Sequence, residues 1–107
     1  MTLRQRQPEL SDAALEDLRR LSEYVTQFDE TAAERLVNDL VDKLHHIAEI
    51  GVTGSTRPFL PADVRAFPYR NWCFYFTVSD TTLNVLRVLS SDQDTRGIVF
   101  GSDDTSH

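Results

Sequence analysis

Lysine, cysteine and histidine are scarce in this sequence of 107 residues, and each shortage excludes a kind of chemistry. Lys43 is the only lysine, and the other basic residues are arginines, which bind carboxylates or phosphates but do not readily transfer protons. Cys73 is the only cysteine, which excludes a disulfide framework and a thiolate metal site. His45 and His46 are adjacent, so on a helix they point about 100° apart and do not share a metal ion.

Long apolar runs are also missing. No run approaches the roughly 18 to 20 residues of a membrane span, and the N-terminal letters MTLRQRQPEL lack the apolar core of a secretory signal. The hydrophobic content of 40% is ordinary for a globular protein. We therefore expect one cytoplasmic domain over residues 1–100, a flexible tail at residues 101–107, and neither a cofactor nor a metal ion.

The formal net charge of −6 is unevenly distributed. Most acidic residues fall in residues 1–50, whereas residues 51–100 carry a slight excess of arginine over aspartate. A protein that binds nucleic acid by neutralising phosphates is usually basic over its working face, so we expect no direct DNA binding by this chain. The sequence also contains no serine, cysteine or carboxylate constellation that identifies an enzyme, and no catalytic residues are assigned.

Apolar residues at steps of three and four predict a first helix over residues 12–27. The repeat consists of Leu15, Leu18, Leu21, Val25 and Phe28. Ser11 precedes it as an N-cap, and acidic residues follow in the first turns, where the helix dipole favours them.

A second helix follows after only a few residues. Its apolar face consists of Leu36, Val37, Leu40, Val41, Leu44, Ile47 and Ala48, and Gly51 is expected to end it. Thr31 with Glu34 fits a capping box, and Asp29 is an N-cap candidate one turn earlier, so the sequence leaves the start open. The short link predicts an antiparallel helical hairpin.

Four short strands are predicted around a loop rich in glycine and proline. They span residues 3–7, 64–67, 71–78 and 83–89, and the loop spans residues 51–62. Pro8 and Pro68 are expected to end the first and second strands, because proline cannot donate to a strand ladder. The third strand contains WCFYFTV, which is aromatic on both faces and typical of a central strand covered by helices on one side.

The predicted fold class is α+β, in the order β-α-α-β-β-β. An N-terminal edge strand and an antiparallel helical hairpin pack on a small, mainly antiparallel sheet. Residues 92–100 are expected to form one short helical turn that returns Ile98, Val99 and Phe100 to the core. We expect the hairpin to leave one sheet face open, so that apolar residues there form a partner surface.

The order and spacing of these segments resemble the ParE/RelE toxin superfamily, and more narrowly its ParE branch, often described as plasmid stabilisation proteins. The resemblance covers residues 3–100 and includes LSDAALEDLRRLSEYV, AAERLVNDLVDKL, VRAFP, the aromatic strand and LRVL. It implies a toxin of a type II toxin–antitoxin system. Such a toxin inhibits DNA gyrase by protein–protein contact and is neutralised by a ParD-like antitoxin in a hetero-oligomer.

The resemblance also implies a set of antitoxin- or target-binding residues. Their positions match those where the family carries its arginines, aromatics and terminal aspartate, on and after the strands. The set is Arg65, Phe67, Arg70, Tyr75, Arg87, Asp94 and Arg96. The competing interpretation is structural: the arginines pair with aspartates such as Asp94, and Arg87 inside an apolar strand fits either interpretation equally.

The sequence departs from the family pattern after the fourth strand. Members often carry a histidine directly after RVL and an arginine just before the aspartate, and here these positions are Ser90 and Gln93. The change removes a titrating group, so a gyrase-binding toxin is favoured over the alternative, a ribosome-dependent mRNA endonuclease of the RelE type. A second alternative is a non-toxic member that only binds its antitoxin.

Overall fold

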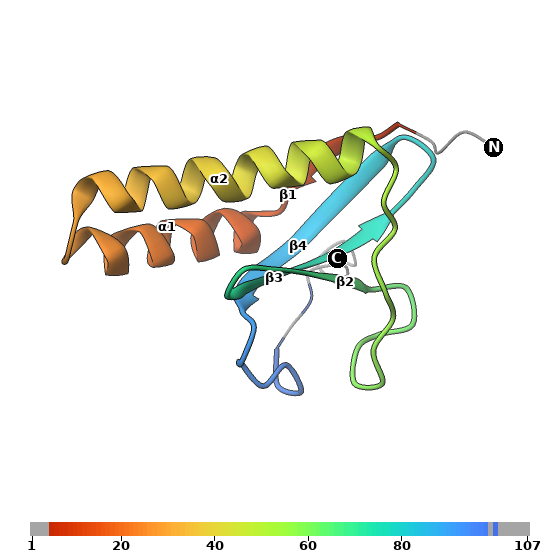
Figure 1. The fold of residues 1–107 in the computed structure, drawn as a ribbon. Helices are drawn as coiled ribbons and strands as arrows, with labels where there is room; N and C mark the ends of the chain where they lie inside the picture. Colours follow the sequence, from red (N-terminus) through yellow and green to blue (C-terminus); the bar gives the residue numbers. More distant parts are fainter. Residues whose placement is uncertain (1–4, 99, 101–107) are drawn as a thin grey trace.

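A helical hairpin covers one face of a four-stranded sheet in the computed structural model, which describes residues 5–98 and 100 (Figure 1). In chain order the elements are β1 (Gln7–Leu10), α1 (Asp12–Thr26), α2 (Glu30–Glu49), β2 (Arg65–Tyr69), β3 (Trp72–Val78) and β4 (Thr82–Ser90). The predicted α+β class and the predicted order of elements are confirmed. Within the described ranges, neither helix is long and apolar enough to cross a membrane.

Both helices begin at polar caps that the sequence contains. The Ser11 side chain accepts a hydrogen bond from the Ala14 N–H at 3.0 Å, which confirms the predicted start of α1. For α2, the Asp29 carboxylate accepts from the backbone N–H groups of Thr31 and Ala32 at 2.9 and 3.1 Å. Asp29, and not Thr31, is therefore the cap. The helix ends before Gly51, which adopts a φ of 80°.

The sheet has the order β1-β4-β3-β2; among the described strands, β1 runs parallel to its neighbour β4 and the other pairs are antiparallel. The prediction that Pro8 ends the first strand was wrong, because Pro8 lies inside β1 opposite Leu83. The N–H groups of Gln7 and Ser11 donate to carbonyls around β4, so the intervening Pro8 nitrogen points away from the ladder and no donor is missing. Residues 1–4 of the predicted strand lie outside the described residues.

The prediction that Pro68 ends the second strand was also wrong, because β2 continues to Tyr69. Pro68 pairs with Cys73, and β2 is an edge strand. Ala66, two residues earlier, exchanges backbone hydrogen bonds with Ser55 on the outer side. Because the direction of the backbone N–H repeats every two residues along a strand, the Pro68 nitrogen also faces the outer edge, where β3 does not need a donor.

Two hydrophobic clusters fill opposite faces of the sheet. The cluster on the helix side consists of Ala14, Leu18, Leu21, Leu40, Leu44, Ile47, Ala48, Phe74, Phe76, Leu83, Val85 and Val88. The cluster on the far side consists of Val64, Ala66, Cys73, Tyr75, Leu86, Leu89 and Phe100, with Leu60 and Ile98 packed against it. Burial of these side chains at roughly 25 cal/mol per Å² is the main stabilising contribution.

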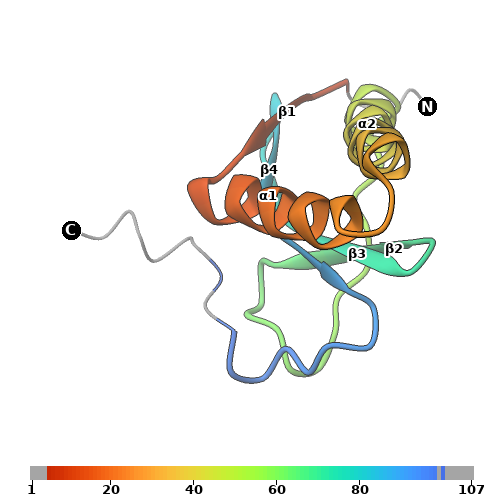
Figure 2. The same ribbon diagram turned by 90° about the vertical axis from the view of Figure 1, so that its left-hand side faces the viewer.

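The far face of the sheet is therefore covered, which corrects the prediction of an open face. In Figure 2 the helices lie above β2 and β3, whereas the loop after α2 and the segment after β4 lie below them. Both segments contribute apolar side chains, Leu60 from the loop and Ile98 and Phe100 from the C-terminal part. A two-layer domain without such segments would leave Tyr75 and Leu89 in water, which is unfavourable.

The C-terminal segment forms single turns and no regular helix within residues 92–98. Gln93 donates to the Ser90 carbonyl, and Ile98 donates to the Thr95 carbonyl, each closing one turn. Phe100 returns to the core as predicted, at 6% exposure. The predicted contribution of Val99 and the predicted tail at residues 101–107 lie outside the described residues.

Candidate partner-binding surfaces

A groove of about 760 Å³ runs between α1 and α2 and reaches Leu10 of β1. Its apolar lining consists of Leu10, Leu15, Leu18, Ala33, Val37 and Val41, with polar side chains along the rim. Leu15 belongs to the predicted apolar stripe of the first helix, yet its side chain is 53% exposed. Leu15 therefore lines the groove between the helices and forms part of an apolar surface that faces water.

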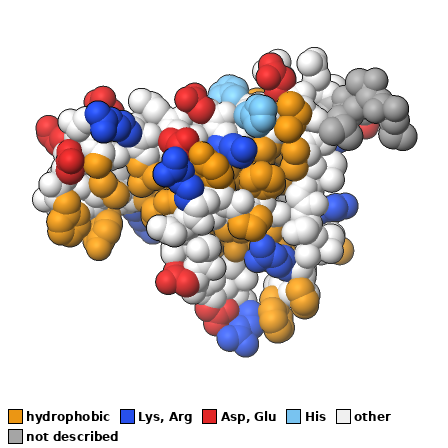
Figure 3. Space-filling model, in the orientation of Figure 1, with side chains coloured by type: hydrophobic (Ala, Val, Ile, Leu, Met, Phe, Trp, Pro, Cys, Tyr) orange, Lys and Arg blue, Asp and Glu red, His pale blue; other side chains and the backbone are white. Residues whose placement is uncertain are grey.

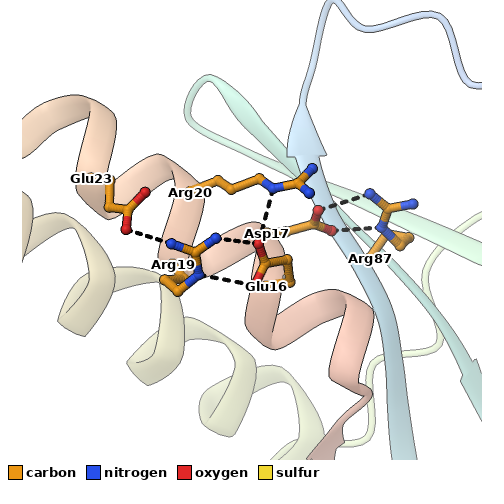
Figure 4. Close-up of polar contacts among 6 residues, drawn as sticks. All are labelled: Glu16, Asp17, Arg19, Arg20, Glu23 and Arg87. Atoms are coloured by element: carbon orange, nitrogen blue, oxygen red, sulfur yellow. Dashed lines mark hydrogen bonds and ion pairs between the residues drawn. The ribbon is translucent and has the colours of Figure 1, made fainter.

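The charged side chains of α1 form a network beside this groove (Figure 4). Arg19 pairs with both Glu16 and Glu23, and Arg20 pairs with Glu16 at 3.1 Å. The Arg19 guanidinium holds the pKa of the Glu16 carboxyl at about 2. All these groups are exposed, so they contribute little to stability and instead set the charge pattern at the groove's edge.

Arg87 is held by a buried carboxylate (Figure 4). Its Nε lies 2.7 Å from Asp17 Oδ2, and its NH2 group donates to Asp17 Oδ1 at 2.8 Å. The Asp17 carboxylate raises the pKa of Arg87, most strongly by accepting its hydrogen bonds and also by its negative charge. The two side chains are only 16% and 6% exposed, so Arg87 has a structural position. The predicted alternative partner, Asp94, instead pairs with Arg96.

Arg65, Phe67 and Arg70 lie together along the edge strand β2 and its turn, beside α2. The Phe67 and Tyr69 rings stack on Phe74, at centroid distances of 6.4 and 6.2 Å. Arg70 adopts a φ of 57° in the turn, and its Nε lies 2.8 Å from Asp39 Oδ2. The neighbouring Tyr69 hydroxyl and then the Asp39 carboxylate raise the pKa of Arg70.

Sequence reasoning did not predict two further residues of this surface, Lys43 and Tyr69. Lys43 of α2 places its Nζ 5.8 Å from the Phe67 ring centroid and 5.2 Å from that of Tyr69. The Tyr69 hydroxyl donates to Asp39 at 2.9 Å. The sequence does contain a signal for Tyr69, because it follows Phe67 at the two-residue spacing that places both side chains on one strand face. The contact of Lys43 with these rings could not be predicted, because it depends on how α2 packs against the sheet.

The remaining predicted residues lie on the opposite side of the sheet. Tyr75 is buried at 3% exposure against Phe100, with ring centroids 5.3 Å apart. Burial and the neighbouring Cys73 raise the pKa of Tyr75 to about 12. Arg96 pairs with Asp94 at 2.8 Å and covers the Phe59 ring at 5.5 Å. The predicted set is thus divided among the β2 edge, the buried pair at Arg87, and the far face.

The comparison with protein families agrees with this architecture. Residues 9–95 match the model described as ParE toxin of type II toxin-antitoxin system, parDE. The chain belongs to the ParE toxin family. The resemblance drawn from the sequence is thereby confirmed, and the protein is a toxin of a type II toxin–antitoxin system.

A solved structure shows the same fold as this ParE family member. A chain of the chromosomal ParDE TA system from P. aeruginosa superimposes with a TM-score of 0.65 at 20% sequence identity. The match covers 79% of this chain and 95% of that chain. No curated protein matches the sequence.

Proposed function

We propose that this ParE-family toxin acts in the cytoplasm, inhibits DNA gyrase by protein–protein contact, and is neutralised by a ParD-like antitoxin. Family membership supports the toxin–antitoxin part. The observation that carries the binding part is the apolar groove between α1 and α2, with Leu15 half exposed at its edge. An amphipathic antitoxin helix that lays its apolar face into this groove would bury that surface.

The edges of the sheet favour a helix over an added strand as the antitoxin's binding element. The outer side of β2 is bridged by Ser55 at Ala66 and lacks a donor at Pro68. Along β4, the Ser11 hydroxyl donates to the Leu86 carbonyl, and Asp17 accepts from the Val88 N–H. Strand addition is therefore hindered at β2 and at the end of β4, which favours the groove as the docking site.

Co-expression tests the antitoxin part. The chain expressed alone is expected to arrest growth, and the neighbouring small gene is expected to relieve the arrest. Leu15→Glu would place a charge in the groove, so we expect the purified variant to lose at least tenfold in antitoxin affinity, about 1.4 kcal/mol. Ile50→Glu is the matched control, because Ile50 is 42% exposed outside the groove lining. Equal losses for both variants would remove the groove assignment.

A supercoiling assay tests the target. Purified toxin is expected to inhibit gyrase or to stabilise its cleaved DNA complex, and added antitoxin is expected to restore supercoiling. Cleaved transcripts in arrested cells, without a gyrase effect, would point to the RelE-type endonuclease. Antitoxin binding without growth arrest would identify a non-toxic member.

A further inference from the structure

We propose that a second surface, formed by Lys43, Arg65, Phe67 and Tyr69, binds an acidic extended segment of a partner protein. We call it the basic–aromatic surface. It lies on the flank of α2 that faces β2, whereas the groove lies on the flank that faces α1 and β1. The inference goes beyond the proposed function, because it depends on neither the groove nor the identity of the target. Figure 3 shows basic side chains among hydrophobic ones along this flank.

The aromatic part of the surface is held in place before any partner arrives. Phe67 and Tyr69 stack on the fully buried Phe74 ring, and the Tyr69 hydroxyl is fixed by Asp39 at 2.9 Å. Lys43 sits over both rings. Half-buried rings that are already ordered lose little conformational entropy on binding, which favours them as contact residues.

Some basic side chains at this surface have an anionic partner and others do not. Arg70 is paired with Asp39, so that position is locally neutral. Among the described residues, Lys43 and Arg65 make no ion pair and no side-chain hydrogen bond, and both side chains are partly buried. The Lys43 ammonium lies over the two ring faces, which leaves its N–H donors available for an oxygen acceptor. An anionic group above Phe67 would therefore meet a cation from α2 and another from β2.

An acidic peptide fits these charges better than a nucleic acid. Two cations without a carboxylate partner among the described residues match two carboxylates, whereas nucleic-acid affinity depends on many phosphate contacts over a basic face. The chain carries a net charge of −6, which repels a polyanion and leaves this flank as a local exception. Arg65, Phe67 and Tyr69 alternate along β2, so a segment in extended conformation presents side chains at the same repeat of roughly 7 Å.

Fluorescence anisotropy with labelled ten-residue probes tests the proposal on the full chain. The probes are an alternating Glu-Thr peptide, the matching Gln-Thr and Lys-Thr peptides, and a ten-nucleotide oligothymidine. The Glu-Thr peptide is expected to bind at least tenfold more tightly than the other probes, and its affinity is expected to fall as salt is raised. No preference for the acidic peptide, or tighter binding of the oligothymidine, would overturn the proposal.

Substitutions test whether the acidic peptide binds at the basic–aromatic surface. The double variant Lys43→Gln with Arg65→Gln keeps both rings, and we expect it to weaken the acidic peptide at least tenfold. Arg35→Gln is the matched control, because Arg35 is an exposed arginine of α2 without an ion pair among the described residues. An equal effect of Arg35→Gln would contradict the assignment. Leu15→Glu is expected to leave peptide binding unchanged, so failure of the groove and failure of this surface are distinguishable.

Discussion

Asp17 of α1 forms a two-point ion pair with Arg87 of β4 and also takes the place of a missing strand beside β4. The strand β1 ends at Leu10, opposite Val85, whereas β4 continues to Ser90. Beyond that point the Asp17 carboxylate accepts from the Val88 N–H at 3.0 Å and from the Arg87 guanidinium at 2.7 and 2.8 Å. One side chain thus satisfies an open edge and joins the first helix to the sheet.

Asp17→Ala is expected to lower the free energy of unfolding by about 3 kcal/mol, because it leaves a partly buried guanidinium and a buried backbone N–H without this acceptor. Urea denaturation of the purified chain measures the loss. Asp94→Ala is the control, since the Asp94–Arg96 pair is more than 60% exposed on both sides, and its loss should be much smaller than that of Asp17→Ala. Equal losses would show that the Asp17 pair contributes no more than a surface pair.

This pair also shows where sequence reasoning ends. The periodicity within each helix is local, so both helices and their hairpin could be predicted from spacing alone. The partners Asp17 and Arg87 are 70 positions apart, and no spacing rule connects them. The sequence therefore left the role of Arg87 open, and its pairing with Asp17 follows only from the packing of α1 on the sheet.

The errors at strand ends have the same origin. Whether a proline ends a strand depends on which neighbour its nitrogen faces, and that is a property of the sheet order. Pro8 and Pro68 both face the outside of an edge strand, so neither breaks the ladder. The cover on the far face was missed because Leu60 comes from a loop without a periodic pattern, and the predicted return of Phe100 to the core did not specify which face of the sheet it covers.

The cap of α2 yields a prediction that separates the two candidates left open by the sequence. Asp29→Ala removes the acceptor for two N–H groups of the first turn and is expected to cost about 1 kcal/mol. Thr31→Ala is expected to change stability by less than about 0.5 kcal/mol, because Thr31 is exposed and is not the cap. Thermal unfolding by circular dichroism measures both. A larger loss for Thr31 would reverse the assignment.

Gly54 is expected to tolerate no side chain. It adopts a φ of 67°, and a Cβ there would lie 2.9 Å from the Ala66 carbonyl oxygen and from the Phe76 ring. Gly54→Ala should therefore lower stability by about 2 to 4 kcal/mol, from backbone strain and from the shift of β2. Gly97→Ala is the control, because a Cβ at that position meets nothing within 4 Å. Gly97→Ala should change the free energy of unfolding by less than about 1 kcal/mol. Urea titrations of both variants measure these changes.

Tyr75 is expected to make stability fall at alkaline pH. Its pKa is raised from 10.0 to about 12, first by burial and then by the neighbouring Cys73. The folded chain therefore retains the phenol proton in a range where the unfolded chain loses it, so this contribution is present below pH 10 and is lost as pH rises towards 12. By linkage the loss relative to Tyr75→Phe should reach about 1.4 kcal/mol at pH 11. Urea titrations of both proteins at pH 8 and pH 11 measure this difference, and parallel behaviour of the two would show that the buried phenol does not titrate in this way.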